Sequence, residues 1–121
     1  MSLIRVDNFG PSAGGTTYSA GGIAKAWVNF NGTGTIAVRD SENVASLTDY
    51  GTGRYRANFS SVFGAGDYSA VVTPRNEGGS VSATLDSSDN FSDYIIMRVW
   101  TSAPALVDVS TACITCHGDL A

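Results

Sequence analysis

The sequence has little charge and almost no histidine. Of its 121 residues only 15% are charged, and it contains one histidine, two cysteines and three prolines. A Ser-His-Asp hydrolase needs its histidine between a nucleophile and an acid. The single candidate, His117, lies four positions before the last residue. We therefore expect no enzyme.

Basic residues and long apolar runs are also scarce. Seven Lys and Arg stand against eleven Asp and Glu, for a net charge of -4, and only Arg54 and Arg56 lie close together. Nucleic-acid binding needs a basic face, so we expect no nucleic-acid partner. No run approaches the ~20 apolar residues that span a bilayer, which predicts no membrane insertion. The first residues also lack the basic and then apolar pattern of a secretory signal.

What the chain does contain is glycine, with 14 residues, and short β-prone runs about ten residues apart. Each run ends at Gly, Asn, Asp or Pro, which is the spacing of an antiparallel β-sandwich or barrel. The runs cover residues 23–30, 35–40, 44–50, 54–59, 68–74, 81–86, 93–101 and 106–115. We predict an all-β, jelly-roll-like antiparallel β-sandwich of about seven to eight strands over residues 23–121.

Residues 1–22 have a different composition, rich in Gly, Ser and Thr. Within them only the stretch Leu3–Val6 could add a strand. We interpret this segment as an N-terminal arm that can lie over a neighbouring subunit. Its apolar residues are the candidate assembly contacts: Leu3, Ile4 and Val6.

One motif suggests a cofactor. Cys113, Cys116 and His117 spell C-x-x-C-H, the spacing that attaches a c-type haem, and the same residues could be part of a zinc site or a redox pair. On a strand, however, residues three apart point to opposite faces. We therefore expect one cysteine inside and one outside, with no cofactor and no metal. A c-type cytochrome stays a remote alternative, as does a metal site or disulfide between converging subunits.

Other candidate residues lie at turns. Two carboxylates could serve glycoside hydrolysis, but Asp40, Glu42, Asp49, Asp67 and Glu77 all lie in or beside predicted turns, where acidic side chains are usually solvated or cap the turn. Most aromatic residues fall within strands, whereas Tyr50 and Phe63 lie at predicted loops. With Arg75 and Asn76 of the turn "RNEGGS", they are the candidate receptor-contact residues.

About forty residues carry a resemblance to a known family. The stretches "AKAWVNFNGTGT" (24–35), "RDSENVASLTDYGTGRY" (39–55) and "NFSS" (58–61) resemble, in order and spacing, a segment of bacteriophage tail-fibre and related virion proteins. The matched residues are turn and core residues, so no active site carries over.

The resemblance implies a non-enzymatic virion structural protein, made in the host cytoplasm and assembled as a homotrimer. Its expected role is a tail-fibre or receptor-binding module, with a capsid decoration (head-fibre) protein as the alternative. The implied partners are other virion proteins of tail or capsid and a host cell-surface glycan or protein.

Overall fold

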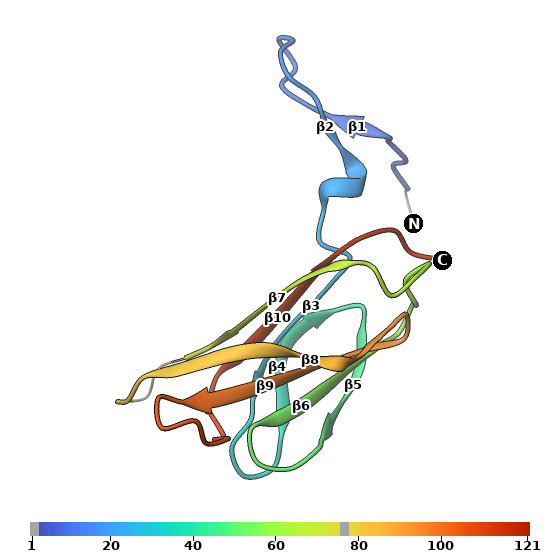
Figure 1. Ribbon diagram of the computed structural model, residues 1–121. Helices are drawn as coiled ribbons and strands as arrows, with labels where there is room; N and C mark the ends of the chain where they lie inside the picture. The colour runs from blue at the N-terminus through green and yellow to red at the C-terminus, as the bar shows by residue number, and fades with distance from the viewer. Residues whose placement is uncertain (1–2, 76–77) are drawn as a thin grey trace.

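Two four-stranded antiparallel sheets pack face to face (Figure 1). The computed structural model describes residues 3–75 and 78–121, apart from the side chains of residues 87–90. One sheet has the order β4-β3-β10-β7 and the other β5-β6-β9-β8. The strands are β3 (Ala26–Asn31), β4 (Ala37–Glu42), β5 (Val44–Asp49), β6 (Arg54–Phe59), β7 (Ser69–Pro74), β8 (Val81–Phe91), β9 (Tyr94–Thr101) and β10 (Ala112–His117).

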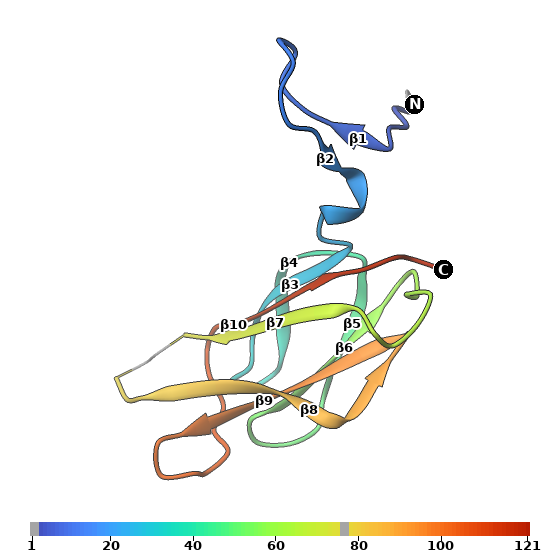
Figure 2. The same cartoon turned by 45° about the horizontal axis from the view of Figure 1, so that its top comes forward.

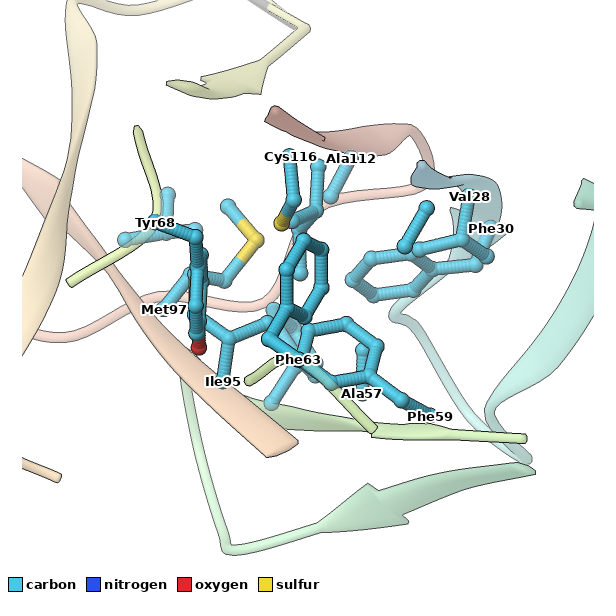
Figure 3. Close-up of a cluster of buried hydrophobic side chains, with 14 of the residues drawn as sticks. Val28, Phe30, Ala57, Phe59, Phe63, Tyr68, Ile95, Met97, Ala112 and Cys116 are labelled. Carbon is cyan, nitrogen blue, oxygen red and sulfur yellow. The ribbon is translucent and has the colours of Figure 1, made fainter. Parts of the chain in front are cut away.

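The core forms because apolar residues alternate along the central strands. In β3, β6 and β10 every second residue is buried, as expected when side chains point to opposite faces of a strand. The inward residues of the two sheets meet in one cluster, which Figure 3 shows around Phe30, Phe59 and Met97. The sheets are thus held together mainly by burial of apolar area.

The predicted sandwich is confirmed, and its eight strands correspond to the eight expected runs. Two details differ. The connectivity uses hairpins within a sheet (β3–β4, β5–β6 and β8–β9), whereas a jelly roll mostly alternates between sheets. The last strand also begins at Ala112 and not at Leu106, because the segment before it serves as a loop, in which Ala105 and Val107 bond to the C-terminal end of β9.

The sandwich has two distinct ends. β3 starts beside the arm and runs away from it, and each later strand reverses direction (Figure 2). The turns β3–β4, β5–β6, β7–β8 and the loop β9–β10 therefore gather at the end far from the arm, which we call the distal end. The chain's C-terminus lies at the other end, which we call the arm end (Figures 1 and 2).

The arm projects from the sandwich as a small hairpin. β1 (Asn8–Phe9) pairs with β2 (Tyr18–Ser19), and the 3₁₀ turn η1 (Ala20–Gly22) follows. The expectation that Leu3–Val6 could form a strand is wrong, since these residues have no strand pairing. The arm pairs further along, between β1 and β2, because Pro11 and two positive-φ glycines, Gly14 and Gly15, let the chain reverse between these strands.

Candidate functional site

The most unusual surface of the protein is the arm. All six of its large apolar side chains between residues 3 and 23 are exposed, with exposed fractions from 46% to 86%. They are Leu3, Ile4, Val6, Phe9, Tyr18 and Ile23. Apolar side chains concentrated on a projecting segment mark an interaction site more often than isolated exposed ones do.

Few contacts fix the arm to the sandwich. The side chain of Lys25 donates to the carbonyl of Ala20 at 3.1 Å, and the backbone N–H of Ile23 donates to the same carbonyl at 3.3 Å. The Ser19 hydroxyl accepts from Gly21 and caps the 3₁₀ turn. A two-stranded hairpin is marginal in water on its own. The arm therefore offers more apolar area to a partner than it buries within this chain.

Tyr50 and Arg75 lie at the distal end, as the turn prediction required. Tyr50 is 44% exposed and its ring lies 5.7 Å from the guanidinium of Arg54. Arg75 is exposed, and its backbone N–H donates to Thr111 at 2.8 Å, next to β10. The two residues thus belong to different sheets. The fourth predicted contact, Asn76, lies outside the described residues.

The prediction for Phe63 is wrong. This residue is only 1% exposed and stacks on Tyr68 with 4.3 Å between ring centroids. It also lies at the arm end, where it bridges to Leu120. Phe63 lies in a loop, but its backbone bridges to the end of the chain and its ring packs among the aromatic rings of the core (Figure 3).

The cysteine motif lies on β10, as the strand interpretation predicted. Cys116 is fully buried and points into the core (Figure 3). Cys113 lies on the outer side of the same strand and is partly exposed. His117 follows Cys113 on the outer side. The side chains of Cys113 and Cys116 thus lie on opposite faces of the sheet. In this arrangement the two sulfurs cannot both bond to one haem or ligate one metal ion.

This arrangement predicts a large difference in thiol reactivity. Burial raises the pKa of the Cys116 thiol to about 12, and the thiolate is the reactive form. At pH 8 a thiol-specific reagent should modify one cysteine per native chain and two after denaturation. In Cys113→Ser the native reaction should vanish. Two rapidly modified cysteines in the native wild-type chain would contradict the buried position of Cys116.

Of the carboxylates named from the sequence, Asp40 and Glu42 lie within strand β4 and not in a turn, and Asp40 accepts from the backbone N–H of Ser41 at 2.9 Å. Glu77 lies outside the described residues. Asp49 accepts from the backbone N–H of Gly51 at 2.8 Å and so caps its own turn. At the arm end a shallow hollow of about 390 Å³ is lined by both Asp67 and Asp119.

Among the described residues no group of three metal-ligating side chains forms. No helix in the described part of the chain is long and apolar enough to cross a membrane.

Comparisons of this chain with family models, curated proteins and solved structures found no match.

Proposed function

We propose that this chain is a non-enzymatic structural protein of a bacteriophage virion, a tail-fibre or receptor-binding module. Its arm attaches it to the particle, and the distal end of its sandwich faces the host surface. The observation that carries the proposal is the exposed apolar arm, which leads directly into the central strand β3 at the end opposite the distal turns. The resemblance of residues 24–61 to virion proteins supports the same assignment.

The arm and the sandwich would have different roles, attachment to the particle and contact with the host surface. Burial of one exposed Leu, Ile or Val side chain contributes about 1.5–3 kcal/mol, so the arm's side chains supply enough apolar area for stable attachment. Many copies on one particle then make weak contacts by the distal ends effective through avidity. In a homotrimer each arm would clamp a neighbouring copy as well as the particle.

The test places charge on the arm of the full-length chain. In the double variant Ile4→Asp/Val6→Asp, incorporation into particles should fall at least about a hundredfold, because two apolar contacts are lost. The melting temperature should stay within about 2 °C, since both side chains are exposed. Quantitative immunoblotting of purified virions measures the first effect, and calorimetry measures the second.

The matched control is Val38→Asp, which charges an exposed side chain on the edge strand β4 and should leave incorporation unchanged. Normal incorporation of the arm variant would overturn the attachment role. Labelled copies on the shell lattice and not on the tail would overturn the tail-fibre assignment in favour of capsid decoration.

A further inference from the structure

Three arginines converge on the outer face of the sheet β5-β6-β9-β8. Arg54 and Arg56 lie two residues apart on β6, so both point outward, and Arg54 pairs directly with Arg98 of β9. Strand geometry places the backbone positions of the three residues within about 8 Å of one another. Three of the seven basic residues of a chain with net charge -4 thus share one small area.

Among the described side chains, one buried carboxylate lies between them. Asp86 is 3% exposed, and one of its oxygens accepts from Arg54 Nη2 at 3.0 Å and from both Nε and Nη2 of Arg98 at 2.7 Å. Like charges directly opposite in a sheet repel, and Asp86 offsets that repulsion. Each of the two guanidinium side chains remains about a third exposed.

Arg56 is held in another way. Its guanidinium carbon lies over the ring of Tyr94, 3.5 Å from the centroid, and the guanidinium donates to the hydroxyl of Tyr50 at 3.2 Å. Among the described residues the ion pairs of this face involve only Arg54 and Arg98 with Asp86. Arg56 therefore presents a fixed positive charge with no described carboxylate against it, and the described side chains leave two net charges on the face.

Aromatic rings and hydroxyls surround these charges. Tyr50 is exposed, and the partly exposed Trp100 is fixed by a bond from its indole N–H to the Thr84 hydroxyl at 3.2 Å. On the neighbouring strands Asn58 donates to Ser46 and Thr48. Exposed aromatic planes with fixed polar groups around them suit a ligand with apolar C–H faces and many hydroxyls.

We propose that this arginine face (Arg54, Arg56 and Arg98 with Tyr50, Tyr94 and Trp100) binds a carboxylate-bearing saccharide. The guanidiniums would pair with uronate carboxylates, as those of Arg54 and Arg98 already do with Asp86, and the rings of Tyr50 and Trp100 would pack against sugar rings. The two net charges that the described side chains give this small area are few for a polyphosphate, whose binding depends on many basic contacts. The inference deepens the proposed function by naming the chemistry of the surface contacted, and it rests on that proposal for its biological role.

The test uses the purified full chain and two probes with the same ring skeleton. Oligogalacturonate should bind in calorimetric titration at low salt, and its methyl ester should bind at least tenfold more weakly, because only the charge differs. Arg56→Gln should lower affinity for oligogalacturonate at least tenfold with a melting temperature within about 2 °C, since Arg56 is outside the Asp86 ion pairs. Arg39→Gln, which removes the same charge from an exposed site on β4 of the other sheet, should bind like wild type.

Equal binding of the methyl ester, no binding of either probe, or an unchanged Arg56→Gln affinity would each overturn the inference. Equal affinity for single-stranded DNA of the same charge would also overturn it, in favour of a general anion surface. Because these titrations need no particle, their failure leaves the arm's attachment role standing. Conversely, a chain that binds uronates but is absent from virions would refute only the proposed function.

Discussion

Gly53→Ala is expected to be among the most destabilising single substitutions in this protein. Gly53 has φ +64°, and a Cβ there would lie 2.7 Å from the backbone nitrogen of Val107 and 2.8 Å from the carbonyl oxygen of Val99. These are backbone atoms of β9 and of the loop that follows it, so no side chain can rotate away. Overpacking costs about 1–3 kcal/mol or more and left-handed backbone about 1–2 kcal/mol. Denaturant unfolding should therefore show a loss of about 2–5 kcal/mol.

The matched control is Gly34→Ala. Gly34 has nearly the same backbone angle, φ +59°, but no atom lies within 4 Å of the added Cβ. Only the backbone cost of about 1–2 kcal/mol should appear. Equal losses for the two variants would show that the close approach of the β9–β10 loop to Gly53 does not hold in solution.

The second large effect is expected for Phe63→Ala. The side chain is 1% exposed and lies between two aromatic neighbours, with ring centroids 5.0 Å from Phe59 and 4.3 Å from Tyr68. Removal of a buried Phe costs about 3–5 kcal/mol because a cavity remains. The melting temperature of a domain of this size should fall by about 10–20 °C, which calorimetry can measure.

The adjacent residue provides the comparison. Val62 belongs to the same irregular segment but is 41% exposed, so Val62→Ala should cost less than about 1 kcal/mol. A Phe63→Ala chain that melted within about 2 °C of wild type would place Phe63 at the surface, where the sequence alone had suggested it.

The strands were the predictable part of this fold. Arg54–Phe59 was predicted with its observed limits, because strict alternation and the glycines just before it, Gly51 and Gly53, both act locally. The longest apolar run became β9, a central strand with Ile95, Ile96 and Met97 all buried. The opposite sides of Cys113 and Cys116 also followed from strand periodicity alone.

Features that depend on distant parts of the chain could not be predicted. Phe63 lies between Ser and Gly residues and has no regular pattern around it, and it is buried because the chain's last residues pass beside it. The arginine face likewise needs the pairing of β6 with β9, which sets Arg98 opposite Arg54. Alternation in "RYRANF" places Arg54 and Arg56 on one side of β6. Arg98 and Asp86 join them only through the pairing of β6 with β9 and of β9 with β8.

The path of the chain from the arm into β3 has a mechanical consequence. β3 is hydrogen-bonded on both sides, to β4 and to β10, and a load on the arm runs parallel to it. If the distal end is held, that load shears the hydrogen bonds of the β3–β4 and β3–β10 pairs at once, so that they do not break one after another. Tension between the two ends of the molecule is therefore spread over the middle of its sheet.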